Sequence, residues 1–376
     1  MNKKFSLLVA LLLFALVLAA CGGGETVTET VEVEVTRIVE VEVPAEGGAA
    51  AEPVTMAEGG DTLAEVQERG FLRCANNGTL AGFGFVDEAG NFSGFDWDYC
   101  RAMAAAVLGD SEAVEGRAVT ATERFPVLQS GEADMLSRNT TATTTRDTAL
   151  GFDFAPITFY DGQGMMVRAD SGITDLAGLE GGTVCVQAGT TTETNLADVM
   201  RREGITYEAV VFPDNPSTSQ AYDEGRCDGL TTDKSGLVSV KAAQLSVPED
   251  HVILEVTMSK EPLGPLTRHG DNNWNDILSW VVNCTIQAEE FGITSENVQE
   301  SLGSDDPTVL NLLGVEGDLG QAMGLNNDFC LQVIEQVGNY GEIYDRNLGP
   351  DTLFNLPRGI NALWTDGGLL YSPPFR

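Results

Sequence analysis

The sequence predicts an α/β protein with two lobes, each built on a mostly parallel sheet, and a mainly helical C-terminal part. Three observations support this fold class. Strand-like and helix-like segments alternate in the central chain, the alternation occurs in two series with a crossing segment between them, and the chain becomes mainly helical from about Lys260. Strands that alternate with helices form parallel sheets covered on both faces. With 376 residues, the chain is long enough for two domains of ordinary size.

Residues 1–20 are typical of a secretory signal peptide. Lys3 and Lys4 provide the positive start, and the apolar run from Phe5 to Ala19 is too short for a comfortable membrane span. The run ends in Leu-Ala-Ala-Cys21, which resembles a bacterial lipobox and implies cleavage before Cys21 and acylation of its thiol. The alternative is an ordinary signal peptide followed by an incidental cysteine. We expect an exported protein that is lipid-anchored at the cell membrane and faces the periplasm or the extracellular side.

Residues 21–60 are expected to form the lipidated N-terminus and a low-complexity tether. The segments TVEVEVTR and IVEVEVPA repeat alternating valine and glutamate, and a stretch rich in Gly, Ala and Pro follows. The alternation has the period of a β-strand, but no core partner for it is evident. We prefer a spacer to the alternative, a self-associating stalk.

The first series of elements begins with a short helix that Asp61 or Thr62 caps and that ends at Gly70. A strand at 71–75 follows it. The other elements expected in this series are a helix at 96–108, a strand at 116–122, a helix at 123–130, a short buried strand at 133–137 and a helix-like segment at 141–149.

The second series repeats the pattern and is expected to form the second lobe. Its elements are strands at 183–189, 207–212 and 227–233 and helices at 190–204, 218–225 and 234–245. The C-terminal third contains two further helix-like stretches, 275–292 and 327–347, and ends in a tail rich in Pro, Gly and aromatic residues.

The composition of the chain argues against several kinds of binding partner and of metal site. The formal net charge of −36 argues against nucleic acid and against an anionic bilayer surface as partners. No CxxC spacing occurs and the only histidines are His251 and His269, so we expect no zinc site and no cofactor. Apart from Cys21 the chain has six cysteines, an even number that indicates structural disulfides in an oxidising compartment but leaves 15 pairings open.

Arg146 is the first candidate ligand-binding residue. The buried strand at 133–137 is followed by Asn139, Thr140 and Thr141, and Arg146 lies one turn into the helix-like segment. We expect Thr141 to cap that helix and leave backbone N–H groups free, while the planar guanidinium of Arg146 binds a carboxylate in a bidentate manner. The alternative is a plain capped helix with a surface arginine.

Two further candidates follow strands of the second lobe, and a fourth lies in the first loop. Thr190 and Thr191 follow a strand and offer donors to the same anion, although Thr190 with Glu193 also reads as a capping box. Asp233 follows another strand and could receive an ammonium group, or could be a helix N-cap. Asn77 and Leu80 are candidate contacts in the loop after the first strand. Together these residues describe a receptor for a free α-amino acid between two lobes.

The chain from about residue 65 onward resembles the general L-amino acid binding proteins of ABC transporters, a long-tailed branch of the type II solute-binding proteins, family 3. The motifs that carry the resemblance include GFDWDYCRAMAAAVLGD, ERFPVLQSGEADMLSRNTTATTTRDT, VCVQAGTTTETNLAD, GRCDGLTTDKSGL, SKEPLGPLTRHGD and LPRGINALWTDGGLLYSPPFR. The resemblance implies a two-lobed type II periplasmic-binding-protein fold with two hinge crossings and a mainly helical C-terminal extension. Lobe 1 would comprise residues 61–160 and 256–376, and lobe 2 residues 161–255.

The resemblance also implies roles for the candidate residues. Arg146, with Asn139 and Thr141 ahead of it, would hold the ligand carboxylate, Thr191 would add a contact to it, and Asp233 would hold the α-ammonium. The first-loop positions are acidic and aromatic in receptors for basic amino acids, so Asn77 and Leu80 indicate a broad pocket instead. The implied disulfides are Cys74 with Cys100, Cys185 with Cys227, and Cys284 with Cys330.

The function expected from these inferences is that of the extracytoplasmic solute-binding component of an amino acid ABC importer. Its partners would be L-amino acids and the permease subunits in the membrane, with no nucleic acid, and the protein would be a monomer tied to the membrane only by its N-terminal lipid. The alternative is an enzyme on the same fold, such as a dehydratase or a peptidoglycan lyase. We expect no enzyme, because the sequence shows no GxSxG elbow, HExxH motif or P-loop and no histidine in a candidate loop.

Overall fold

The computed structural model describes residues 60–376. The expected signal peptide, the lipidation site Cys21 and all of the expected tether except Gly60 lie outside the described residues. Within the described part of the chain, no helix is long and apolar enough to cross a membrane.

The first sheet has five strands in the order β5-β1-β6-β14-β7. Parallel pairing joins β1 (Leu72–Asn76) to β5 (Val114–Ala118) and to β6 (Met135–Leu136), and β14 (Leu266–Arg268) pairs antiparallel with β6 and with β7 (Phe152–Phe154). The loop after β1 forms a small antiparallel sheet of β2 (Thr79–Leu80), β3 (Gly84–Val86) and β4 (Phe92–Ser93). The helices of this part are α2 (Thr62–Arg69), α3 (Phe95–Leu108) and α4 (Arg124–Gln129).

Helix α3 is buried along most of its length, and its sequence explains why. A run of small residues, Ala102 and Ala104 to Ala106, is almost fully buried and permits close approach of neighbouring helices. The helix begins after Gly94, which has φ 123° and at which a Cβ would lie 2.3 Å from the Phe83 carbonyl oxygen, so only glycine fits there. It ends at Gly109 in the left-handed conformation, as the sequence predicts.

The second sheet has the order β10-β9-β11-β8-β12. Its parallel strands are β9 (Thr183–Gln187), β10 (Glu208–Phe212) and β11 (Gly229–Asp233); β8 (Phe159–Arg168) pairs antiparallel with β11, and β12 (His251–Ile253) pairs antiparallel with β8. The helices of this part are α5 (Thr191–Glu203), α6 (Asn215–Asp223) and α7 (Lys234–Ala243), with short 3-10 turns η3 (Ala169–Ser171), η4 (Leu176–Leu179) and η5 (Pro248–Asp250).

The chain crosses between the two sheets twice, as the expected fold requires. Strand β8 carries it from the first sheet to the second, and β13 (Lys260–Leu263) carries it back. The two crossings lie side by side, because β13 pairs antiparallel with the first residues of β8, from Lys260 opposite Gly162 to Leu263 opposite Phe159. The expected lobe boundaries at residues 160 and 255 fall close to these crossings and remain predictions.

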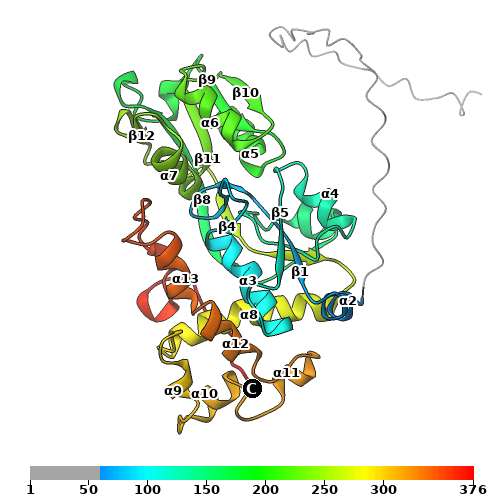
Figure 1. Cartoon of the computed structure of the whole chain (residues 1–376). Coiled ribbons are helices and arrows are strands. Elements are labelled where there is room, and N and C mark those ends of the chain that lie inside the picture. The colour runs from blue at the N-terminus through cyan, green and yellow to red at the C-terminus, as the bar shows by residue number, and fades with distance from the viewer. Residues whose placement is uncertain (1–59) are drawn as a thin grey trace, which may run out of the picture. The chain divides into compact units, whose positions relative to one another are not determined.

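The C-terminal part is mainly helical and packs on α3 (Figure 1). Its elements are α8 (Asn272–Glu290), α9 (Val298–Ser301), α10 (Pro307–Leu312), α11 (Leu319–Ala322), α12 (Phe329–Gln336) and α13 (Tyr340–Asn347), followed by the 3-10 turns η6 (Gly359–Asn361) and η7 (Trp364–Asp366). The helix expected at 327–347 is therefore two helices. The chain breaks at Gly338, with φ 97°, and Asn339 starts α13 with a capping box that includes Glu342.

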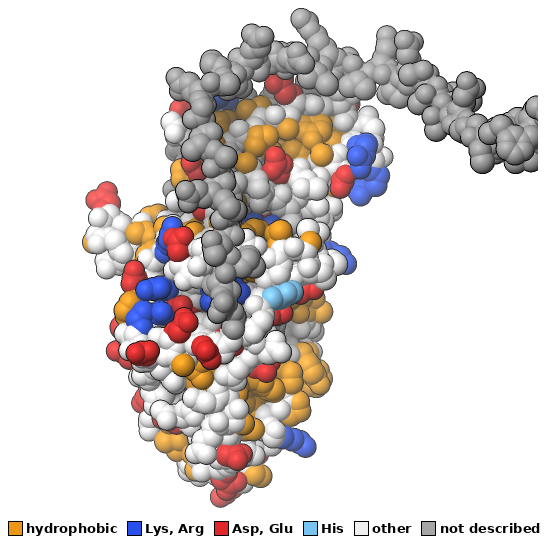
Figure 2. Space-filling model, turned by 90° about the vertical axis from the view of Figure 1, so that its right-hand side faces the viewer, with side chains coloured by type: hydrophobic (Ala, Val, Ile, Leu, Met, Phe, Trp, Pro, Cys, Tyr) orange, Lys and Arg blue, Asp and Glu red, His pale blue; other side chains and the backbone are white. Residues whose placement is uncertain are grey.

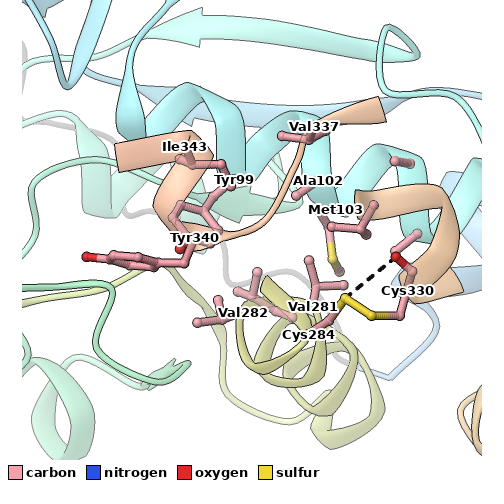
Figure 3. Packing of buried hydrophobic residues seen from close by; sticks show 14 of the residues in the cluster. Tyr99, Ala102, Met103, Val281, Val282, Cys284, Cys330, Val337, Tyr340 and Ile343 are labelled. Carbon is pink, nitrogen blue, oxygen red and sulfur yellow. Dashed lines mark hydrogen bonds between the residues drawn. A yellow bond between two sulfur atoms is a disulfide. The ribbon is translucent and has the colours of Figure 1, made fainter. Parts of the chain in front are cut away.

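Three disulfides cross-link the described part of the chain, and their pairing is the one that the resemblance implied. Cα–Cα distances are 5.9 Å for Cys74–Cys100, 5.6 Å for Cys185–Cys227 and 5.8 Å for Cys284–Cys330, all within the usual range. Figure 3 shows the last of them, which joins α8 to α12, beside Val281 and Met103 in the hydrophobic core.

The expected helix with Thr141 at its cap is wrong. Only η2 (Thr145–Ala149) is helical, as a π-type turn. Thr141 instead forms an isolated antiparallel bridge with Leu263, and its hydroxyl donates to Glu261 Oε2 at 2.6 Å. The run of β-branched threonines at 143–145 is a poor helix former, so the tertiary contacts of Thr141 decide the backbone conformation.

Candidate ligand-binding site

Two adjoining cavities lie between the sheets, where the loops after their parallel strands meet. This is the usual place for a ligand in open α/β sheets. The smaller cavity, about 20 Å³, is lined by Arg124, Arg138, Asn139, Thr141, Gln187, Thr190, Thr191, Thr192, Thr232 and Asp233. The larger, about 130 Å³, is lined by Asn77, Thr79, Ala118, Val119, Thr120, Glu123, Arg138, Gln187, Asp214 and Asn215. Arg138 and Gln187 line both, so the two cavities share a wall.

The loops that form the two walls of the smaller cavity contact each other. The Thr141 and Thr191 hydroxyl oxygens are 3.3 Å apart, and Arg124 Nη2 donates to the Gly189 carbonyl at 3.3 Å. Gly189 has φ 71°, and a Cβ there would lie 2.8 Å from the Thr122 methyl group, so glycine permits this approach. A space of this size holds about one water. A larger ligand therefore requires the walls to move apart, and the two crossing strands provide the hinge for that motion.

Larger cavities occur elsewhere but lack this chemistry. One of about 500 Å³ is an open groove on the second lobe, and one of about 260 Å³ lies under the C-terminal tail. Neither is lined by a buried charged side chain, whereas the small cavity is lined by three: Arg124, Arg138 and Asp233. Convergent buried polar groups rather than volume identify the candidate site.

The structure brings most of the sequence-predicted residues to these cavities. Asn139, Thr141, Thr190, Thr191 and Asp233 line the smaller one. Asn77 lines the larger one and donates to Asn139 Oδ1 at 2.8 Å, which links the first loop to the end of β6. Leu80 lines neither cavity, because its side chain is buried in the hydrophobic core of the first lobe.

Arg146 lies directly behind the lining of the smaller cavity. Its Nη1 donates to the Thr141 carbonyl at 2.7 Å, and its guanidinium carbon lies 5.1 Å from the centre of the Phe125 ring. The side chain is 6 % exposed, so it is not a surface arginine. Burial lowers the pKa of Arg146 to about 10, an effect that the carboxylates of Glu261 and Asp233 oppose. The group stays charged at neutral pH and close enough to the cavity to act on an anion.

Asp233 does not act as a helix cap. It stands at the N-cap position of α7, but its side chain makes no capping hydrogen bond, and Oδ1 is buried with no partner among the described residues. Burial, followed by repulsion from Asp161 and Glu261, raises the pKa of Asp233 well above its usual range. A buried carboxylate without a partner is costly unless a cation fills its place. Asp233 therefore does not have the role of a capping residue, and its binding of an ammonium group remains a prediction.

Thr190 caps α5, as the sequence pattern indicates, but the capping box is incomplete. The Thr190 hydroxyl accepts from the Glu193 backbone N–H at 3.0 Å, while Glu193 accepts from Gly189 N rather than from Thr190 N. Thr191 is the first residue of α5, and its hydroxyl donates to Glu261 Oε2 at 2.8 Å. This places the N-terminus of α5 against the smaller cavity.

Sequence reasoning missed two acids at the crossings, the buried Glu261 and the partly buried Asp161. Glu261 on β13 accepts from Thr141, Thr191 and Asn195, at 2.6, 2.8 and 2.7 Å, and from Ser259, so it links loops of both lobes to the hinge. Asp161 on β8 accepts from Gly162 and from Ser235. Nothing in the sequence singled these acids out among the 57 acidic residues.

Sequence reasoning also missed two buried arginines. Arg124 and Arg138 are 2 % and 4 % exposed, and within residues 60–376 neither has a carboxylate oxygen within 4.0 Å. Burial, then the charges of Arg138 and Arg146, lower the pKa of Arg124 well below its usual value. Arg138 directly follows the same buried strand as Asn139, so the reasoning that selected Asn139 applied equally to it. Three neighbouring, unpaired guanidinium groups are what a receptor for anions requires.

This local positive charge contrasts with the rest of the molecule. The chain has a net charge of −36, and Figure 2 shows acidic side chains spread over the face drawn. An anion approaching such a surface gains nothing from the overall field. Its binding therefore depends on the buried arginines of the cleft.

Asp96 is a buried acid beside the site, and we expect its titration to make the folding stability of the protein depend on pH. Its Oδ2 has no partner among the described residues, and burial raises the pKa of Asp96 from 3.8 to about 7, opposed by the charge of Arg138 and by the Asn139 backbone amide. Between pH 4 and pH 7 the folded state thus retains a proton that the unfolded chain releases, so stability falls as pH rises through this window. Asp96→Asn, which mimics the protonated acid, should lose less stability than the wild type between pH 5 and pH 8 in thermal melts. Equal losses would contradict the assignment.

Comparisons with known proteins agree with the geometry. The family model of bacterial extracellular solute-binding proteins, family 3, matches residues 72–350. The chain is 50 % identical over 317 residues to the general L-amino acid-binding periplasmic protein AapJ of Rhizobium johnstonii, covering 84 % of this chain and 93 % of that one. It is 48 % identical over 324 residues to the glutamate/glutamine/aspartate/asparagine-binding protein BztA of Rhodobacter capsulatus, covering 86 % and 96 %.

A solved structure has the same fold over nearly the whole described chain. The ABC transporter periplasmic binding protein from Brucella ovis with glutathione bound superimposes with a TM-score of 0.82 at 48 % identity, covering 84 % of this chain and 99 % of that one. These relatives are named as binding proteins and not as enzymes, so the enzyme alternative is not favoured. The chain belongs to family 3 of the bacterial extracellular solute-binding proteins.

Proposed function

We propose that this protein is the extracytoplasmic receptor of an amino acid ABC importer: it binds free L-amino acids between its two lobes and delivers them to the permease. The observation that carries the proposal is the buried, partnerless Asp233 carboxylate, which lines the same cavity as the buried Arg124 and is acted on by the charge of Arg146 behind the lining. A free α-amino acid presents an ammonium and a carboxylate on one carbon, and opposite charges on the two walls match this arrangement.

In this proposal each lobe contributes to the ligand. Arg146 and Thr141 of the first lobe and Thr191 of the second would hold the α-carboxylate, and Asp233 of the second would hold the α-ammonium. Asn139 would orient Asn77 at the cavity wall, and Thr190 would hold the start of α5 in place. Because the ligand contacts both lobes only when they are closed, its binding favours the closed state, which is the form that a permease can distinguish.

The names of the relatives support the ligand class. One is a general L-amino acid-binding protein, another a glutamate/glutamine/aspartate/asparagine-binding protein, and the Brucella ovis structure holds glutathione, which contains a free α-amino acid group. Anchoring through acylated Cys21 and action as a monomer complete the proposal. Acylation of Cys21 rests on the lipobox-like sequence alone.

A thermal-shift panel tests this function. The chain without its first 20 residues, with Cys21→Ser to prevent acylation, is heated with each of the twenty L-amino acids and with small acids and amines that lack one of the two α-groups. A ligand at about 100 times its dissociation constant should add about 2.7 kcal/mol of stability. Shifts with L-amino acids but not with the matched acids and amines support the proposal. No shift with any L-amino acid contradicts it.

A further inference from the structure

Arg138 holds a position in the cleft that binding of the α-groups does not explain. It is one of two residues that line both cavities, at the wall between the space beside Asp233 and the larger space beyond. Its side chain is 4 % exposed. Whatever occupies the larger cavity next to a ligand in the smaller one therefore meets the Arg138 guanidinium.

The guanidinium of Arg138 is largely unsatisfied. Its Nε donates to the Val119 carbonyl at 3.3 Å, and within residues 60–376 neither Nη atom has a hydrogen-bond partner and no carboxylate oxygen lies within 4.0 Å. By comparison, Arg268 donates from Nη1 to the carbonyls of Leu128 and Ala133, at 3.1 and 2.7 Å. A buried cation left in this state lacks the compensation that buried charges normally have.

The acids around the larger cavity do not supply that compensation. Glu123 is exposed and accepts from the Thr120 backbone N–H and hydroxyl at 2.9 and 2.8 Å, and Asp214 caps α6 by accepting from Ser217 N at 2.8 Å. Asp96 lies near Arg138, but with a pKa raised to about 7 it carries only part of a charge at neutral pH. The buried wall of the larger cavity is thus positive, and its acids are engaged with their own backbone.

We infer that the larger cavity takes the side chain of the ligand and that Arg138 pairs with a carboxylate at the end of that side chain, so that the receptor prefers acidic L-amino acids to their uncharged amides. This inference rests on the proposed function, since it assumes that the α-groups occupy the smaller cavity. The planar fork of Arg138 matches a carboxylate, whereas an amide offers it a single neutral acceptor. Asn77 and Asn215, which also line this cavity, each keep one amide hydrogen that can be donated to either ligand, whereas the Thr79 hydroxyl already donates to Asn77 Oδ1.

The test is a calorimetric titration of the Cys21→Ser chain with L-glutamate and with L-glutamine, which differ in charge but hardly in shape. The wild type should bind L-glutamate at least about 10-fold more tightly than L-glutamine, the minimum expected for a charge-assisted pair in a buried site. Arg138→Gln should weaken L-glutamate about 10- to 100-fold and L-glutamine by less than about 3-fold. Arg138→Lys, which keeps the charge but not the fork, should retain part of the preference. Arg117→Gln, an exposed arginine on β5, should change neither affinity.

The outcomes separate this inference from the proposed function. If the wild type binds L-glutamine as tightly as L-glutamate, or if Arg138→Gln weakens both equally, the inference is wrong while amino acid binding stands. If the wild type binds neither ligand, nor any other L-amino acid, both are wrong. The comparison of the two ligands on the wild type needs no variant, so it decides the matter even if Arg138→Gln does not fold.

Discussion

Replacing Arg146 by alanine should abolish measurable binding of L-amino acids while the protein stays folded. The variant removes the group proposed to hold the α-carboxylate that every amino acid shares, so all ligands should be affected alike. Each hydrogen bond between charged groups contributes about 1.5–3 kcal/mol, so loss of a bidentate pair corresponds to at least about 100-fold in affinity. Calorimetry with L-glutamate and L-alanine measures the effect.

Arg146 also supports its surroundings, so stability must be measured alongside binding. Its Nη1 hydrogen bond to the Thr141 carbonyl is buried, and its loss should cost about 1–3 kcal/mol of unfolding free energy without unfolding the chain. Arg146→Lys should keep more stability than Arg146→Ala but bind weakly, because an ammonium cannot form the bidentate pair. Arg117→Ala is the matched exposed control. Micromolar binding by a folded Arg146→Ala variant refutes the assigned role.

Asp233→Asn should separate binding from stability. It removes the partner proposed for the α-ammonium, so L-glutamate should bind about 100-fold or more weakly, whereas glutarate, which lacks the amine, should be almost unaffected. The unliganded fold should keep or gain stability at pH 8. Burial raises the pKa of Asp233 well above its usual range, so its ionised form opposes folding above the pKa of the unfolded chain, and asparagine mimics the neutral acid.

The same titrations identify the opposite case. If Asp233→Asn weakens L-glutamate and glutarate equally, Asp233 acts through the structure of the site and not through the ammonium. A loss of thermal stability at pH 8 would likewise show that its charge is compensated in the unliganded protein. Asp228→Asn, an exposed aspartate five residues earlier, should leave both affinities unchanged.

The fold could be predicted from the sequence because local and long-range signals agree. Strands β9 and β11 and helices α3 and α5 lie within one or two residues of most of their expected ends, where glycines and capping residues mark the boundaries. The secondary-structure prediction failed where tertiary contacts override the local conformational preference of the sequence. Thr141 is drawn into a bridge with Leu263 and a hydrogen bond to Glu261, neither of which leaves a mark in the sequence around it.

The sequence predicted several residues that line the candidate site, but it did not predict the buried charged groups Arg124 and Glu261. A search of the residues that follow buried strands finds Asn139, Thr191 and Asp233, because strand ends converge in this fold. Arg124 lies on the short helix α4 and Glu261 on the crossing strand β13, so a search of the residues that follow buried strands does not find them. Their proximity to Asp233 depends on how the two lobes meet, which only the three-dimensional structure shows.

The most direct test of the account is a crystal structure of the chain with L-glutamate bound. The account predicts the ligand between the two sheets, with its ammonium at Asp233, its α-carboxylate at Arg146 and Thr191, and its side-chain carboxylate at Arg138. L-glutamate bound outside this cleft, or in the cleft with its ammonium away from Asp233, would contradict the central claim.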